Sequence, residues 1–242
     1  MNFKSLASSS AGNAYLVEDG ETVLLLECGI AAKELKKRTN FKTSEIAGVL
    51  VTHEHKDHCR AIKTLLDDGI PVYASYGTAA ALDEGRIKCL EERQTVLIGT
   101  ISVTAFRTFH DAQEPFGFLL QSYVTGERLL FATDTCNIQY RFRDLDQIAV
   151  ECNYDKEILD RSKHLPQKVK DRIQNSHFEV HSCLKFLQEV DAYFEGKGLS
   201  KCKRIFLLHL SDACSDEKKF KRVFEKEINK KYPKIEIIIC EK

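Results

Sequence analysis

The sequence predicts an α/β protein in which layered sheets are flanked by helices. Short apolar runs with strand character occur early and late in the chain, and amphipathic segments with helical spacing lie between them. No linker-like tract or internal repeat interrupts the 242 residues, which are enough for a sizeable core. We therefore expect one domain over residues 1–242.

The predicted strands are short runs rich in β-branched, aromatic or other apolar residues, bounded by polar or turn residues. In chain order, they are expected at residues 15–17, 22–26, 48–51, 72–74, 95–98, 101–106, 118–123, 129–132, 148–150, 205–208 and 235–239. Thr125-Gly126-Glu127 is expected to form a hairpin turn between two of these strands.

The predicted helices cover residues 30–38, 57–67, 78–84, 179–194 and 216–230. In the fourth, an apolar stripe indicates packing against a sheet; it consists of Val180, Cys183, Leu184, Leu187 and Val190. Residues 155–172 lean basic, with six Lys or Arg interleaved with four acidic residues. This pattern favours a solvated helix face, and a track for phosphate groups is the alternative.

Bulk composition limits the partners of the chain. The 36 Lys and Arg balance the 36 Asp and Glu, so no whole-molecule field attracts it to nucleic acid or membrane. Nine cysteines without a Cys-x-x-Cys pair suit buried thiols in a reducing cytosol better than disulfides. The first fifteen residues lack an apolar signal core, and no apolar stretch has the length of a membrane span. We expect a soluble cytoplasmic protein without a membrane partner; a homodimer is possible.

Residues 52–58 read Thr-His-Glu-His-Lys-Asp-His and directly follow the apolar run Val49-Leu50-Val51. Three imidazoles and a carboxylate therefore lie within six positions at the end of a predicted strand. Neutral imidazole nitrogen and carboxylate oxygen are both ligands of first-row metals. This heptad predicts a metal site formed by His53, His55, Asp57 and His58.

Further candidate ligands follow other predicted strands. These residues are Glu27, His110, Asp134 and His209. If the strands run the same way, these residues reach one edge together with His53. The heptad has donors for two ions but cannot complete both shells, since each ion needs about three or four protein ligands. We expect His110, Asp134 and His209 to supply the remaining donors.

The order of these motifs resembles that of the metallo-β-lactamase-fold hydrolases, which carry His-x-His-x-Asp-His, then a separate His, a separate Asp and a final His. The resemblance implies a four-layer αββα sandwich with a dinuclear site. It assigns one metal to His53, His55 and His110, and the other to Asp57, His58 and His209. Asp134 would bridge the two ions. Zinc is the expected metal, with manganese or nickel as alternatives.

Three segments resemble the YycJ-like branch of this superfamily, which is associated with DNA exonuclease activity. They are the Ser/Gly-rich opening at residues 8–13, His-Asp-Ala-Gln-Glu-Pro-Phe-Gly at 110–117, and His-Leu-Ser at 209–211. One residue departs from the pattern, because Glu27 stands where an Asp is usual. Its longer side chain can still orient a ligand by accepting a hydrogen bond.

Two ions about 3.5–4 Å apart can activate a bridging hydroxide and neutralise a phosphodiester. Asp57 and His177 are the predicted catalytic residues. His177 precedes a predicted helix, and we expect it to act as general acid or to contact phosphate. A surface histidine without a role is the alternative. Ser9 and Asn13, with neighbours Ser10 and Gly12, are predicted to contact the substrate, although a simple turn also explains this loop.

These observations predict a dinuclear metal-dependent phosphodiesterase, a nuclease of the DNA exonuclease type. The same ions would also serve hydrolysis of a small cyclic or linear nucleotide. A thioester or lactam hydrolase is less favoured, because Cys59-Arg60 follows the heptad where glyoxalase-like relatives usually have Gly. A purely structural zinc site is disfavoured too, since such sites are closed and Cys-rich.

Overall fold

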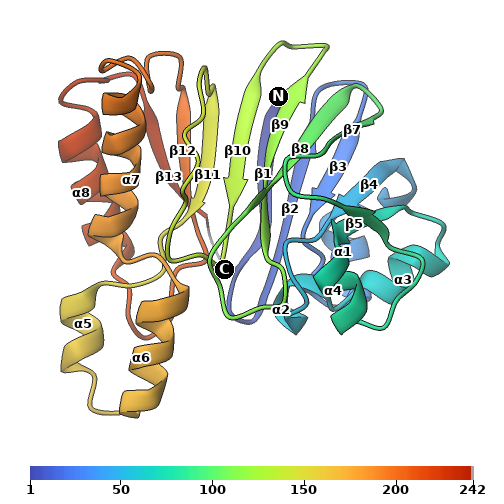
Figure 1. Ribbon diagram of the computed structural model, residues 1–242, viewed down its shortest axis with the longest axis horizontal. Coiled ribbons are helices and arrows are strands. Elements are labelled where there is room, and N and C mark those ends of the chain that lie inside the picture. Colours follow the sequence, from blue (N-terminus) through green and yellow to red (C-terminus); the bar gives the residue numbers. More distant parts are fainter. Residues whose placement is uncertain (241–242) are drawn as a thin grey trace. The chain divides into compact units, whose positions relative to one another are not determined.

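The computed structural model describes residues 1–240, which form two compact units (Figure 1). Unit 1 consists of Met1–Arg107 and Ala112–Glu127. Unit 2 consists of Thr108–Asp111 and Arg128–Cys240.

Unit 1 contains a six-stranded sheet whose strands follow one another in chain order. They are β1 (Asn2–Ser9), β2 (Gly12–Glu18), β3 (Val23–Leu26), β4 (Ile46–Leu50), β5 (Val72–Ser75) and β6 (Lys88–Leu90). The first three strands are antiparallel, and β3 to β6 are parallel. Because β3 and β4 run the same way, Glu27 and His53 emerge at the same edge.

Helices of unit 1 pack on this sheet through their apolar residues. They are α1 (Ala32–Arg38), α2 (Lys56–Cys59), α3 (Ile62–Asp67) and α4 (Tyr76–Ala81). Leu35 of α1 and Leu65 of α3 share one buried cluster with Leu25 and Val49 of the sheet. The unit also contains the antiparallel strands β7 (Thr95–Ile98), β8 (Ile101–Arg107) and β9 (Phe116–Ser122).

Unit 2 is built on four parallel strands in the order β10, β11, β12, β13. Their bounds are Arg128–Ala132, Gln147–Glu151, Arg204–Leu208 and Glu236–Ile239. The helices are α5 (Lys156–Arg161), α6 (Gln167–Ser176), α7 (Val180–Tyr193) and α8 (Glu217–Ile228). Figure 1 shows α7 and α8 alongside these strands and α5 and α6 beyond their carboxyl ends. The predicted apolar stripe of α7 is buried.

All eleven predicted strands and five predicted helical regions are present, with small shifts at their ends. The segment predicted as one helix over 57–67 is two helices, because the Ala61 N–H donates to Cys28 O at 2.8 Å between them. Strands β1 and β6 and helices α5 and α6 were not among the predicted elements. All nine cysteines are free thiols in the structure, and seven of them are buried. Among residues 1–240, no helix combines the length and apolarity needed to cross a membrane.

Candidate metal centre

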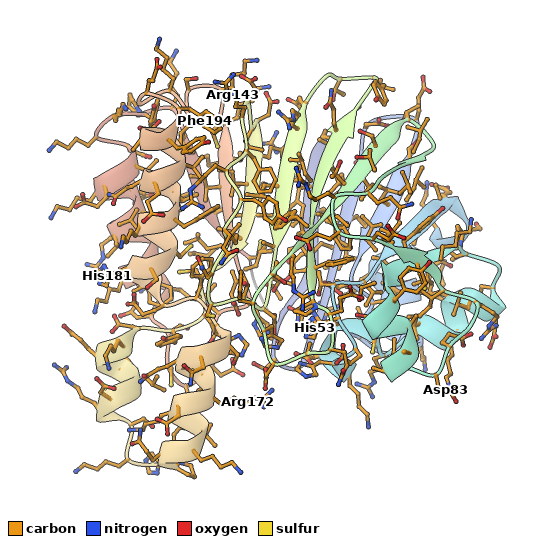
Figure 2. The ribbon with its side chains drawn as sticks, viewed as in Figure 1. His53, Asp83, Arg143, Arg172, His181 and Phe194 are labelled. Carbon is orange, nitrogen blue, oxygen red and sulfur yellow. The ribbon has the colours of Figure 1, made fainter. Side chains whose placement is uncertain are left out.

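In unit 1, His53 and His55 face each other directly after β4. His53 lies at the lower end of the unit 1 strands in Figure 2 and is fully buried. Its Nδ1 lies 2.9 Å from the Thr52 hydroxyl, and its Nε2 lies 3.0 Å from Nδ1 of His55. The strand end therefore brings two imidazole nitrogens to one point, as a shared ion requires.

Asp57 and His58 converge at the start of α2. The Asp57 Oδ2 lies 3.4 Å from Nε2 of His58, although adjacent helical residues ordinarily point apart. Behind them, Glu27 is fully buried with Oε1 3.6 Å from Nδ1 of His58. Burial raises the pKa of the Glu27 carboxyl, against the lowering effect of His58. Glu27 thus lies on the side of the His58 ring away from Asp57, where the sequence predicted an orienting acceptor.

Asn13 is fully buried and holds the Asp57–His58 segment in place. Its side-chain amide donates to Asp57 O at 3.2 Å and lies 3.2 Å from Nε2 of His58. Its Oδ1 accepts from the Tyr15 hydroxyl at 3.1 Å. Ser9 is buried, and its hydroxyl accepts from the Ala11 N–H at 3.2 Å within the β1–β2 turn. The contacts of Ser9 and Asn13 with the substrate stay predictions. The structure adds that Asn13 positions Asp57 and His58 and that Ser9 stabilises the β1–β2 turn.

Close backbone packing also fixes α2. The Cys28 N–H donates to His58 O at 2.8 Å, and the Gly29 N–H donates to Asn13 O at 2.8 Å. A Cβ placed on Gly29 would lie 1.6 Å from Asp57 O. Only glycine allows this approach, so Gly29 sets the position of Asp57.

In unit 2, Asp134 directs its two carboxylate oxygens at two different imidazoles. Its Oδ1 lies 3.2 Å from Nδ1 of His209, and its Oδ2 lies 3.6 Å from Nε2 of His110. Asp134 follows β10 and His209 follows β12, both with left-handed backbone, at φ 44° and 53°. Such conformations cost about 1–3 kcal/mol and are concentrated at functional sites.

Hydrogen bonds fix the ring of His110. Its Nδ1–H donates to Ser176 O at 2.8 Å, which leaves Nε2 as the nitrogen with a lone pair. Burial lowers the pKa of His110, although Asp134 acts in the opposite direction. A neutral ring with its lone pair on Nε2 is the form that binds a metal.

Glu151, at the end of β11, was not among the predicted site residues. It is fully buried, and its Oε1 accepts from Nδ1 of His177 at 2.6 Å and from Nδ1 of His209 at 3.0 Å. Its Oε2 accepts from the backbone N–H of Thr135 at 2.8 Å and of Phe178 at 3.1 Å. Burial acts to raise the pKa of Glu151, but His177 and these bonds lower it, so the group is a carboxylate.

His177 lies between Glu151 and Asp134 at the carboxyl ends of the unit 2 strands. Its side chain is 14% exposed, and its Nδ1 lies 3.9 Å from Asp134 Oδ2. Burial alone would lower the pKa of His177, but the Glu151 carboxylate raises it above the usual value. The predicted general acid therefore occurs beside the unit 2 donors, with a carboxylate that orients it.

The donors in each unit fit a divalent ion. Two ligands about 2.1 Å from a tetrahedral ion lie roughly 3.4 Å apart. The donor pairs described above are 3.0 and 3.4 Å apart in unit 1, and the Asp134–His110 pair is 3.6 Å apart in unit 2. Within unit 2, one donor atom each from Asp134, Glu151, His177 and His209 lies within 4.8 Å of the others. Imidazole and carboxylate together favour zinc, manganese or nickel over calcium.

Comparison with known proteins places this chain among metallohydrolases. Residues 22–194 match the family described as "Beta-lactamase superfamily domain". The chain is 29% identical to "Exodeoxyribonuclease YycJ" of Bacillus anthracis, over 87% of this chain and 83% of that protein. It is 28% identical to "Exodeoxyribonuclease WalJ" of Streptococcus pneumoniae, over 86% and 81%. The metallo-beta-lactamase fold protein YhfI of Bacillus subtilis has a TM-score of 0.71 at 14% identity, over 99% of this chain and 96% of YhfI.

Proposed function

The chain belongs to the beta-lactamase superfamily, and we propose that it is a dinuclear metal-dependent nuclease that cleaves phosphodiester bonds in DNA. It is a metal-dependent hydrolase with the metallo-β-lactamase fold, which confirms the predicted α/β class and the family resemblance. Both curated relatives described above are named exodeoxyribonucleases, and this supports DNA as the substrate.

One observation carries the proposal of two ions. The two oxygens of Asp134 lie beside two different histidines, Oδ1 beside His209 and Oδ2 beside His110, so this one carboxylate would be placed to serve two metals. The proposed ligands of one ion are His53, His55, His110 and Asp134. Those of the other are Asp57, His58, His209 and Asp134. The paired spacing of donors within each unit supports this assignment.

When bound, two divalent ions lower the pKa of a water and neutralise the anionic oxygens of a phosphodiester. The protein's part is to hold the donors in their unprotonated forms. Ser176 O does this for His110, and Glu151 does it for His209, because each accepts a hydrogen bond from Nδ1–H and so leaves the lone pair of the ring on Nε2. Glu27, on the far side of the His58 ring, is proposed to orient it in the same way.

The leaving oxygen needs a proton, and we assign that role to His177. Glu151 holds the ring through Nδ1, so Nε2 is the atom that remains to donate the proton. The negative charge of Glu151 also favours the protonated ring before transfer. Glu151 acts through His177 and His209, so we call it a positioning residue.

The function is tested with purified protein supplied with zinc or manganese and offered single- and double-stranded DNA, RNA, cyclic nucleotides and bis-nitrophenyl phosphate. We expect stepwise shortening of labelled DNA, abolished by Asp57→Ala or by chelation. Circular dichroism of the Asp57→Ala protein provides the folding control. Cleavage of cyclic nucleotides without cleavage of DNA would contradict the nuclease proposal and favour the small-nucleotide alternative.

A further inference from the structure

A helical arm, residues 156–176 with α5 and α6, has an unusual charge for this chain. It contains six Lys or Arg and three acidic residues, whereas the two classes are equal over the whole sequence. The arm lies beyond the carboxyl ends of the unit 2 strands (Figure 1). A local basic excess in a neutral molecule is the kind of feature by which an anionic partner is selected.

Only part of this charge is used inside the protein. Lys156 pairs with Asp160 at 2.9 Å, and the buried Lys170 donates to Asp160 O at 3.0 Å. Lys163 and Lys168 are exposed, and within residues 1–240 their side chains make no hydrogen bond or ion pair. These two free cations lie close in sequence, on either side of the start of α6.

Helix α6 connects these cations to the site. Its 10 residues give a length of about 15 Å. At its carboxyl end, Ser176 O holds His110 at 2.8 Å, and the next residue is His177. Lys168, Arg172 and Asn175 have the spacing of one helix face, and all three are exposed. Figure 2 shows Arg172 on α6, where its Nε lies 2.6 Å from Asp111 Oδ2.

Contacts with the rest of unit 2 hold the arm in place, so its conformation does not depend on a binding partner. Asp155 caps α5 through the N–H groups of Glu157 and Ile158 and pairs with Lys219 of α8 at 2.5 Å. Leu159 is fully buried in a cluster with Tyr154 and Cys214, against which Leu165 and Ile173 pack. Because the arm is fixed, the backbone at Lys163 and Lys168 lies at a set distance from His177. A ligand must therefore be long enough to span that distance if it is to contact both lysines and the site.

We propose that the exposed face of α6, with Lys163 and Lys168 at its far end, binds the phosphate backbone of the nucleic acid being cleaved. This rests on the proposed nuclease function and adds the path of the strand. A strand that follows α6 for about 15 Å passes roughly four phosphates at the spacing of one strand of a duplex. Substrates shorter than about five nucleotides would not reach both lysines.

The test compares Lys163→Glu/Lys168→Glu with a matched control, Lys218→Glu/Lys230→Glu. The control lysines are also exposed, and within residues 1–240 their side chains also make no hydrogen bond or ion pair. Rates are measured on a labelled 20-mer DNA, a trinucleotide and bis-nitrophenyl phosphate. For the arm variant, the ratio of 20-mer rate to small-ester rate should fall about tenfold, and the control should keep the wild-type ratio.

Salt dependence provides a second readout. The slope of log affinity for the 20-mer against log salt should become shallower by about 1.5 to 2 in the arm variant, because two phosphate contacts are lost. An unchanged ratio and slope, or equal losses in the control, would overturn the arm proposal while nuclease activity of the wild type stands. If the wild type neither binds nor cleaves any oligonucleotide, the nuclease function itself fails, and the arm proposal fails with it.

Discussion

At the residue scale, the proposed metal donors could be selected from the sequence because His53, Asp134 and His209 each follow a strand and because the heptad has too few donors for two ions. Glu151 obeys the same rule, since it directly follows Ile148-Ala149-Val150, yet it was not selected. An acidic residue with no His close to it in the sequence is not part of a recognisable metal-binding motif, so nothing in the sequence identifies it as a site residue. Its partners, His177 and His209, are 26 and 58 positions away, so only the fold shows its role.

His177→Ala should lower kcat about 10²–10⁴-fold on DNA, whose leaving group is poor, because the proton donor is lost. On bis-nitrophenyl phosphate the loss should be much smaller, since nitrophenolate leaves without a proton. Steady-state rates on the two substrates measure this split. Equal losses would identify His177 as a phosphate contact instead.

Glu151→Gln tests the positioning role separately. The amide keeps the size of the side chain, but only its oxygen accepts, so it can serve the two imidazoles or the two backbone N–H groups and not all four. We expect the rate on DNA to fall about 10–100-fold and metal affinity to fall by a similar factor, as for other partners of metal-binding histidines. Metal affinity by competition with a chromogenic chelator is the readout. Unchanged metal affinity would show that Glu151 positions His177 and has no effect on the binding of metal by His209.

At the scale of elements, the strands and the long amphipathic helices were predictable from periodicity. The Ser-rich β1 and the short β6 were not, because neither has an apolar run. The arm has few apolar residues, and its helices depend on tertiary contacts such as the burial of Leu159. The role of Gly29 could not be predicted from the sequence either, because the backbone that it contacts, at Asp57, lies 28 positions later.

Gly29→Ala should displace α2, because its Cβ would overlap Asp57 O at 1.6 Å. We expect loss of about 1–3 kcal/mol of unfolding free energy and a loss of activity far beyond that of a stability mutant. Urea unfolding and DNA cleavage at a temperature where the variant is folded separate the two effects. Gly69→Ala is a poor control because its φ is 79°, whereas Gly85→Ala has open space and should be neutral.

Asp155 provides an element-scale prediction for pH. Burial acts to raise the pKa of the Asp155 carboxyl, but Lys219 and the capped N–H groups of α5 lower it below its ordinary value of 3.8. The carboxylate therefore stabilises the fold above about pH 4, and this contribution is lost as pH falls through the lower folded-state pKa. Asp155→Ala should cost about 1–2 kcal/mol at pH 7. By urea unfolding at a series of pH values, the difference from wild type should shrink below pH 4.

At the scale of the whole molecule, the sequence predicts which residues are candidate metal ligands. It does not predict which nitrogen or oxygen atom of each residue would bind the metal. Of the seven proposed metal ligands, four belong to unit 1 and three to unit 2. Ions that bind only the folded chain stabilise it by mass action. With free metal a hundredfold above Kd, each site adds about 2.7 kcal/mol.

Protein purified without added metal should therefore contain about two ions per chain by elemental analysis. Chelation should lower Tm by roughly 5–10 °C for each site emptied, given the usual response of domains of this size. Asp134→Ala, which removes the proposed bridge, should lower the metal content and reduce the effect of chelation on Tm. Lys230→Glu, at an exposed position outside the site, is the matched control. A content of one ion per chain, unaffected by loss of Asp134, would rule out the dinuclear arrangement and leave a mononuclear hydrolase.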